Sequence, residues 1–306
     1  MHIANIPDAD LDATEEELAE EAGGRPSLGV NVTIPEIACV LQQEGTTSAL
    51  SFFPVYPDVE NLAKHMVDVA TRTMELYPDL FIPFIMPPDD DGSPDGFPTV
   101  DATTLEEMLA FDPDVFVGYG EIGLYERDGG AAELLPDADR LMEIYPILDE
   151  QQIAVYFHPG DEMGDNMETV LEAYPNTIFI VHGDQIAPYI IDLMDNYENI
   201  YFTMNDLYGD EWLLRDEVGK DGFLEYFDEN GFDDMIQEDL ALYEDMINAH
   251  PDRFMWGTDR GGESPWTYDI EVGQMLADYG RAFIGSLDED VQENFAYKNA
   301  QRIFAF

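Results

Sequence analysis

The stretch IAVYFHPGDEMGDNMETVLEAYPNTIFIVH (residues 153–182) indicates the fold more clearly than any other part of the chain. Its two ends, IAVYFH (153–158) and TIFIVH (177–182), are short apolar runs rich in β-branched and aromatic residues, which predicts two buried strands. Between them, METVLEAY (167–174) has the apolar spacing of a helix. A strand, a helix and a second strand in this order predict a parallel pair joined by a crossover helix. Both strands end in a histidine, His158 and His182.

The same alternation of strand and helix extends on both sides of this unit, from residue 35 to the end of the chain. Seven apolar runs predict strands, at 47–53, 80–86, 115–121, 153–158, 177–182, 199–205 and 253–259. Apolar strands that are separated by helices form a parallel sheet covered on both faces. One more strand would complete a (β/α)8 barrel, and we expect MHIANI (1–6) to be the end of that strand. We therefore predict an α/β fold, a TIM barrel with an incomplete first strand, in a single domain over residues 1–306.

Two of the predicted helices carry signals at their ends. PEIACVLQQEG (35–45) is expected to close at Gly45, because glycine readily takes the left-handed conformation at a helix C-terminus. TLEEMLAF (104–111) has Thr103 or Thr104 as its expected N-cap. The first of these helices contains the only cysteine, Cys39, which cannot form an internal disulfide and which we expect to be a small buried core residue.

The charge of the chain is unusually negative, with 67 acidic and 12 basic residues and a net charge of −55. Highly charged chains are often disordered, but this one has 45% hydrophobic and 12% aromatic residues, so we predict a folded protein. At molar salt the Debye length is only about 3 Å, which screens the repulsion between carboxylates. We interpret the composition as that of an intracellular protein of a salt-accumulating halophile, which unfolds at low salt. The charge also argues against nucleic-acid partners, because no basic patch meets phosphates.

From the sequence we expect neither a targeting segment nor a membrane span. The N-terminus is acidic and has no apolar signal region. No apolar run approaches the roughly 20 residues that cross a bilayer. We expect a soluble, cytoplasmic protein that acts on a small molecule and has no membrane partner; assembly into a homo-oligomer stays open.

Carboxylate and imidazole side chains fall at the ends of four predicted strands. Glu121 ends VFVGYGE, His158 and His182 end the two strands quoted first, and Asp259 follows FMWGT. In an α/β barrel the C-terminal ends of the strands meet at one face, where catalytic residues gather. Neutral imidazole suits Zn²⁺ and related transition metals, and carboxylates bridge ions or accept protons. We therefore predict a site for one or two divalent ions, with zinc expected and Mn, Fe or Ni open, that activates water.

Five short motifs, in this order, resemble those of the amidohydrolase superfamily, in particular amidohydrolase family 2 and the TatD-like metal-dependent hydrolases. They are GEIGLY (120–125), FHPG (157–160), VHGD (181–184), WGTD (256–259) and KNAQRIF (298–304). The resemblance covers most of the chain from residue 35 onward and implies a mono- or binuclear hydrolase barrel. It implies metal binding by Glu121, His158, His182 and Asp259, with Asp259 also accepting a proton. Glu121 is expected in the bridging role, because no lysine ends the fourth or fifth strand.

The beginning of the chain departs from the family pattern. The family opens with His-x-His at the end of its first strand, whereas this chain has only Met1 and His2. We interpret His2 as the second histidine of that motif and so as a further metal ligand. We accordingly expect the reading frame to continue upstream with a short apolar segment that ends in Asp-x-His. The alternative is that His2 is an ordinary N-terminal residue and that the site is incomplete.

Residues 206–236 interrupt the alternation and are rich in aromatic side chains, which we interpret as a substrate lid; a peripheral subdomain is the alternative. Candidates for substrate binding at the same face are Arg127, Arg260, Tyr125, Asn205 and Trp266. An arginine there suits a substrate carboxylate or phosphate, although a salt bridge with one of the many acidic residues is the alternative.

These observations favour a metal-dependent hydrolase that acts on a carbonyl or phosphoryl centre, with Asp259 as its catalytic residue. Two other functions stay open. One is a nonoxidative decarboxylase of an aromatic or enoic acid within the same superfamily. The other is a degenerate barrel that binds a ligand without catalysis. The substrate itself is not predicted, because specificity depends on the loops.

Overall fold

The computed structural model describes residues 1, 32–55, 62–93, 96–126, 132–205, 207, 212–214, 218–261 and 265–304. Their strands form one parallel sheet of seven strands whose spatial order follows the sequence from β1 to β7. The strands are β1 (Ala49–Pro54), β2 (Phe81–Met86), β3 (Gly118–Gly123), β4 (Ala154–His158), β5 (Phe179–Val181), β6 (Ile200–Met204) and β7 (Phe254–Trp256). The predicted α/β class and its parallel sheet are confirmed.

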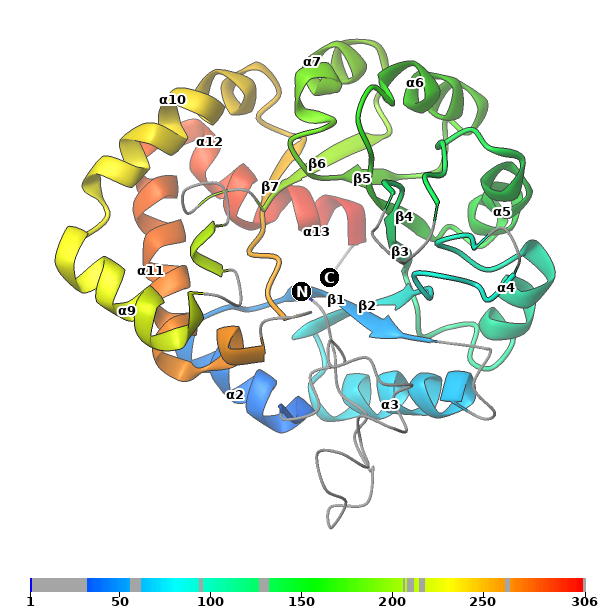
Figure 1. The fold of residues 1–306 in the computed structure, drawn as a ribbon, viewed down its shortest axis with the longest axis horizontal. Helices are drawn as coiled ribbons and strands as arrows, with labels where there is room; N and C mark the ends of the chain where they lie inside the picture. The colour runs from blue at the N-terminus through cyan, green and yellow to red at the C-terminus, as the bar shows by residue number, and fades with distance from the viewer. Residues whose placement is uncertain are drawn as a thin grey trace.

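Helices surround the sheet, which curls around the centre of the molecule (Figure 1). The helices that precede β6 in the sequence are α2 (Ile34–Glu44), α3 (Leu62–Leu76), α4 (Ala102–Leu109), α5 (Asp139–Glu150), α6 (Gly164–Ala173) and α7 (Ala187–Asn196). The helices that follow β6 are η2 (Trp212–Leu214), α9 (Gly219–Asn230), α10 (Asp233–Ala249), η3 (Pro265–Tyr268), α11 (Ile270–Ser286), α12 (Glu289–Glu293), η4 (Asn294–Lys298) and α13 (Asn299–Phe304). None of the helices among the described residues is long and apolar enough to cross a membrane.

Closure of the sheet into a full barrel is the part of the predicted fold that the described residues leave open. They supply seven of the eight strands of a (β/α)8 barrel, with β1 and β7 at the two edges. Met1 lies along the outer edge of β1, where its nitrogen donates to Leu50 O (3.1 Å) and its carbonyl accepts from Phe52 N (3.0 Å). The rest of the predicted first strand, residues 2–6, lies outside the described residues.

Alternate strand residues point into the space enclosed by the sheet, where they form an apolar cluster of their own. Its buried members are Phe52, Ile82, Phe84, Ala154, Tyr156, Ile180, Tyr201 and Met255. Helix α13 covers the N-terminal end of this space with Ala300, Ile303 and Phe304, and the ring of Phe304 meets that of Phe84 edge-on at 5.6 Å. The C-terminal ends of the strands are therefore the ends at which polar side chains can gather.

Helix α2 shows how the local sequence sets the ends of an element. Thr33 and Glu36 form a capping box at its start, and Gly45, with φ 83°, closes it in the left-handed conformation, as predicted. Its buried residues are Ile34, Ile37, Ala38, Val40, Leu41 and Glu44. Cys39 falls between these positions and is exposed, so the prediction of a buried core cysteine was wrong.

The N-cap of α4 differs from the prediction. Asp101, not Thr103 or Thr104, is the cap, and its carboxylate accepts from Thr104 N at 2.8 Å. The helix consequently begins at Ala102, two residues before the predicted start. Aspartate and threonine are both favourable caps, so the sequence alone did not separate them.

The aromatic residues of the 206–236 insertion that the structure describes form a packed layer. Phe223 and Phe227 of α9 are buried, and the rings of Phe227 and Phe232 lie 5.9 and 5.4 Å from that of Tyr279 on α11. Burial of these rings fixes α9 and the start of α10 against α11.

Candidate metal centre

Strands β4 and β5 bring two histidines into the same space. Tyr156 and Ile180 are register partners and both point inward, so the residues two positions further on, His158 and His182, point the same way. Their ring centroids lie 4.3 Å apart. Gly183 follows with φ 100°, and a Cβ there would come within 2.9 Å of His158 Nε2, so this close approach requires glycine.

A β-bulge in β3 turns Glu121 toward these histidines. Tyr119 and Ile122 both pack in the outer core, and the register with β4 shifts between them. Regular alternation would place one residue between two that face outward, but here two intervene, Gly120 and Glu121. Gly120 has φ 132°, and a Cβ there would lie 2.3 Å from Tyr156 O. The bulge therefore depends on glycine and re-aims the carboxylate of Glu121.

The three side chains converge closely enough to hold an ion. Glu121 Oε1 lies 3.0 Å from His182 Nε2 and 3.5 Å from His158 Nδ1, and one ligand atom from each residue lies within 4.8 Å of the others. Ligands about 2.1 Å from a tetrahedral ion stand about 3.4 Å apart, so the observed spacing fits a divalent metal. His182 is 2% exposed, whereas the side chain of His158 is 22% exposed and gives access to solvent or substrate.

Asn205, directly after β6, holds the other side of His182. Its Nδ2 lies 3.1 Å from His182 Nδ1 and 3.3 Å from Tyr156 Oη. Tyr156 Oη in turn lies 2.5 Å from Thr203 Oγ1. Burial, reinforced by the charges of Glu121 and Asp259, raises the pKa of the Tyr156 phenol well above its ordinary value. The phenol therefore keeps its proton, and the chain of hydrogen bonds orients the His182 ring.

Asp259 lies just beyond β7, in a left-handed backbone conformation with φ 44°. It lines a cavity of about 370 Å³ between β1 and β7, together with Tyr156, Thr203 and Asn205. The cavity thus adjoins the histidines through the residues that orient them. Among the described residues, the close group of ligand-type atoms consists of Glu121, His158 and His182, so metal binding by Asp259 stays a prediction.

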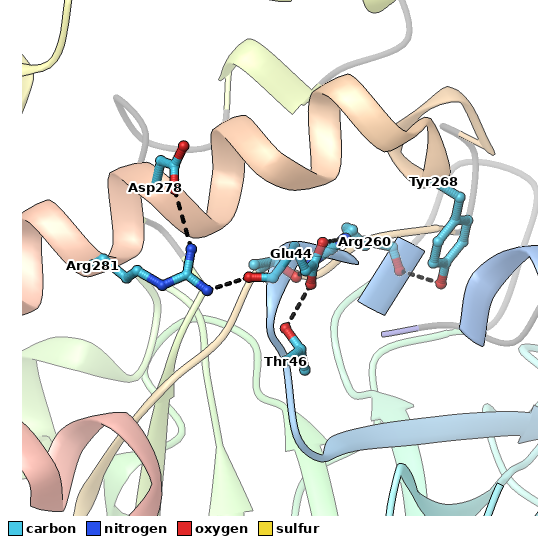
Figure 2. A network of polar contacts seen from close by, with 7 residues as sticks. Glu44, Thr46, Arg260, Tyr268, Asp278 and Arg281 are labelled. Carbon is cyan, nitrogen blue, oxygen red and sulfur yellow. Dashed lines mark hydrogen bonds and ion pairs between the residues drawn. The ribbon is translucent and has the colours of Figure 1, made fainter. Parts of the chain in front are cut away.

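The remaining predicted site residues have different surroundings. The ring of Tyr125 lies 4.6 Å from that of His158. Trp266 packs against Phe223 of the insertion, with ring centroids 5.9 Å apart. Arg260 is 2% exposed and forms an ion pair with Glu44 (Figure 2). His2 and Arg127 lie outside the described residues.

Two residues near the centre were not singled out in the sequence. Tyr156 reaches Asn205, as described above, and could have been found because it precedes His158 by two positions on a strand. Gln185 Oε1 lies 3.4 Å from His158 Nε2. It stands in the turn after β5, and only its closeness to His182 in the sequence could have drawn attention to it.

Comparison with known proteins assigns the chain to a family. A family model described as amidohydrolase matches residues 60–306, and the chain belongs to this amidohydrolase family. None of the curated proteins matches the chain.

Several solved structures have a fold similar to that of this chain. A 2,6-dihydroxybenzoate decarboxylase from Rhizobium has a TM-score of 0.55 and 15% identity over 98% of this chain and 96% of its own. A dihydroxybenzoic acid decarboxylase from Polaromonas sp. JS666, with bound manganese and the inhibitor 2-nitroresorcinol, has a TM-score of 0.54 and 15% identity over 95% and 94%. A probable 2-pyrone-4,6-dicarboxylic acid hydrolase from Acinetobacter baumannii has a TM-score of 0.53 and 12% identity over 90% and 89%. At identities this low, the structural similarity establishes a similar fold only. The activities named are those of the other proteins.

Proposed function

We propose that the protein is a metal-dependent hydrolase that acts on a carbonyl or phosphoryl centre of a small molecule. The observation that carries this proposal is the convergence of Glu121, His158 and His182, with 3.0 and 3.5 Å between the carboxylate and the two imidazoles. A divalent ion bound there would supply Lewis acidity and a water of lowered pKa. Zinc and manganese both suit nitrogen and oxygen ligands of this kind, and His2 and Asp259 are proposed as further ligands.

The chain's own residues then have separate tasks. Asp259, at the cavity wall, accepts the proton of the attacking water and returns it to the leaving group. Tyr125, whose ring packs on that of His158, contacts the substrate on the exposed side of the centre. Asn205 fixes the tautomer of His182. When Nε2 serves as a ligand, the imidazole proton resides on Nδ1, and Asn205 must turn its carbonyl oxygen toward it.

The insertion 206–236 is proposed to cover this site as a lid. Support comes from the contact between Phe223 in α9 and Trp266, which lies in the segment after β7 that also carries Asp259. A segment that leaves the C-terminal end of a barrel strand is well placed to exclude water during catalysis.

A nonoxidative decarboxylase is the second candidate, favoured by the structural similarity to two dihydroxybenzoate decarboxylases. Such an enzyme needs a cation for the substrate carboxylate. Glu44 engages both terminal nitrogens of Arg260, which argues against that residue as the carboxylate anchor. Arg127 would then have this role, so Arg127→Gln should abolish decarboxylation but leave hydrolysis of neutral esters unchanged.

Metal analysis joined to a substrate panel tests the proposal. Protein purified in molar KCl is expected to contain about one or two equivalents of Zn, Mn, Fe or Ni. It should hydrolyse esters, lactones or phosphodiesters, and chelation should stop the reaction. Release of CO2 from hydroxybenzoates, without hydrolysis, would favour the decarboxylase. Protein that takes up no metal and shows neither reaction would contradict both and favour a binding barrel.

A further inference from the structure

Arg260 and Glu44 form a buried ion pair that joins two distant parts of the chain. Glu44 is the last residue of α2, and Arg260 directly follows Asp259. Arg260 Nη1 donates to Glu44 Oε2 at 2.8 Å, and Nη2 donates to Glu44 Oε1 at 2.6 Å. Each residue is 2% exposed. This two-pronged geometry fixes the guanidinium in the plane of the carboxylate, which a lysine could not reproduce.

Further hydrogen bonds hold both partners in place, as Figure 2 shows in part. Thr46 Oγ1 donates to Glu44 Oε1 at 2.6 Å, and Arg260 Nε donates to Thr258 Oγ1 at 3.3 Å. The main chain is held as well, because Tyr268 Oη donates to Arg260 O at 3.3 Å. The residues on both sides of Asp259 are therefore fixed through side-chain and main-chain contacts.

The neighbouring helix is shaped to admit the pair. A Cβ at Gly273 of α11 would lie 2.6 Å from Glu44 Oε2 and 3.2 Å from Arg260 Nη1. Arg281, also on α11, donates through Nη2 to Glu44 O (Figure 2). The pair thus sits between α2 and α11, close to the cavity that Asp259 lines.

Stability alone does not account for such a pair. Removing two charges from water is unfavourable, and apolar residues of similar volume often replace a buried ion pair without loss of stability. A fixed orientation is the property that apolar replacements do not supply. Asp259, between Thr258 and Arg260, has the left-handed φ of 44°, a strained conformation that persists only where the surroundings hold it.

We propose that the Glu44–Arg260 pair positions Asp259, holding its strained backbone so that the carboxylate faces the cavity beside Tyr156 and Asn205. Arg260 and Glu44 are thus positioning residues, not substrate contacts. This inference deepens the proposed function. Of the measurements that test it, only the metal affinity depends on the proposed function.

The test compares the wild-type protein with the double variant Glu44→Leu/Arg260→Met in molar KCl. We expect the apolar pair to preserve the melting temperature. Amide hydrogen exchange of the metal-free protein should become faster in residues 254–261 and stay unchanged in β4 and β5. Mn²⁺ affinity, followed by EPR titration, should fall about tenfold because Asp259 is no longer held. Arg260→Lys, which keeps the charge but not the fork, should give a smaller increase in exchange at the same residues.

The control is Asp278→Asn, which removes an exposed partner of Arg281 at 3.1 Å and should change neither readout. Unchanged exchange in residues 254–261 of the double variant would overturn the proposal, as would a uniform increase over the whole chain. If the double variant does not fold, the same criteria apply to Arg260→Lys. A wild-type protein that binds no Mn²⁺ would instead count against the proposed function, while hydrogen exchange would still decide the role of the pair.

Discussion

The two ends of the strands differ in chemistry although the same strands form both. At the N-terminal end, inward residues such as Ala154 and Phe84 are apolar and are covered by α13. At the C-terminal end, the inward positions hold His158, His182 and Asn205 instead. One strand shows the whole transition: Ala154, Tyr156 and His158 follow one another at every second position of β4.

This difference separates stability from chemistry within one sheet. Apolar packing at the covered end supplies free energy of folding without constraining the polar end. The buried polar groups at the open end are held by hydrogen bonds to one another, as in the chain from His182 to Asn205 and Tyr156. We therefore expect substitutions at the two ends to affect different measurements.

Lowering the salt concentration should have the largest effect, because it acts on the whole surface. Between molar KCl and 0.15 M the Debye length grows from about 3 to about 8 Å, so the repulsion within a chain of net charge −55 increases. We expect cooperative unfolding, measured by circular dichroism, in which the structure at both ends of the strands is lost together. A melting temperature that does not depend on KCl would contradict the halophilic interpretation.

His182→Ala should have the next largest effect, confined to the polar end. It removes one of the three converging ligand atoms, so Mn²⁺ affinity measured by calorimetry should fall by at least about 100-fold. His250→Ala is the matched control, because His250 pairs with Asp195 at 3.1 Å outside the centre. Equal affinities of the two variants would mean that the centre does not bind the metal.

Phe84→Ala tests the apolar end. Phe84 is fully buried and meets the rings of Phe52, Tyr156 and Phe304. Its truncation should lower the free energy of unfolding by about 3–5 kcal/mol, measured by chemical denaturation in high salt. Phe111→Ala, at a phenyl ring that is 49% exposed, should change it by no more than about 0.5 kcal/mol. A large loss of metal affinity in folded Phe84→Ala would remove the distinction between the two ends.

Asn205→Ala should give the smallest of these effects and tests the link between the ends. Without the amide, His182 loses its orienting partner, and metal affinity should fall by about 10–100-fold. Asn205→Asp should restore much of the affinity, because a carboxylate can accept the Nδ1 proton of His182. Asn196→Ala, at an exposed asparagine on α7, serves as the control.

Local patterns predicted the strands well, because each strand is a short apolar run between helices. The prediction succeeded for β4 within one residue, and Gly45 closes α2 as its sequence indicates. Helix starts were less accurate: α10 begins at Asp233, six residues before the predicted start at 239, because its first turn lies in the stretch 206–236 that was interpreted as an insertion. The prediction of a buried Cys39 was wrong because every residue of EIACVL after Glu36 is apolar, so the stretch does not indicate which face of the helix is buried.

The candidate site was only partly visible in the sequence. Strand ends correctly drew attention to His158 and His182, which lie at or just after the ends of β4 and β5. Glu121 was predicted to end its strand but lies inside β3 (Gly118–Gly123), from where the structure brings it to the two histidines. The bulge that turns Glu121 inward has no signal stronger than the glycines around it. The pairing of Arg260 with Glu44 joins residues 216 positions apart, so no local pattern could reveal it. Contacts of this range depend on the assembled fold.

The position of Met1 on β1 has a consequence for assembly of the sheet. Its two hydrogen bonds run in the parallel sense, so a backbone that continued in register there would meet β1 as β1 meets β2. Opposite this rim stands β7, with the cavity in between. A strand that continued from Met1 in this sense would gain main-chain partners along β1. The first residue of the chain therefore already sets the strand direction at this edge of the sheet.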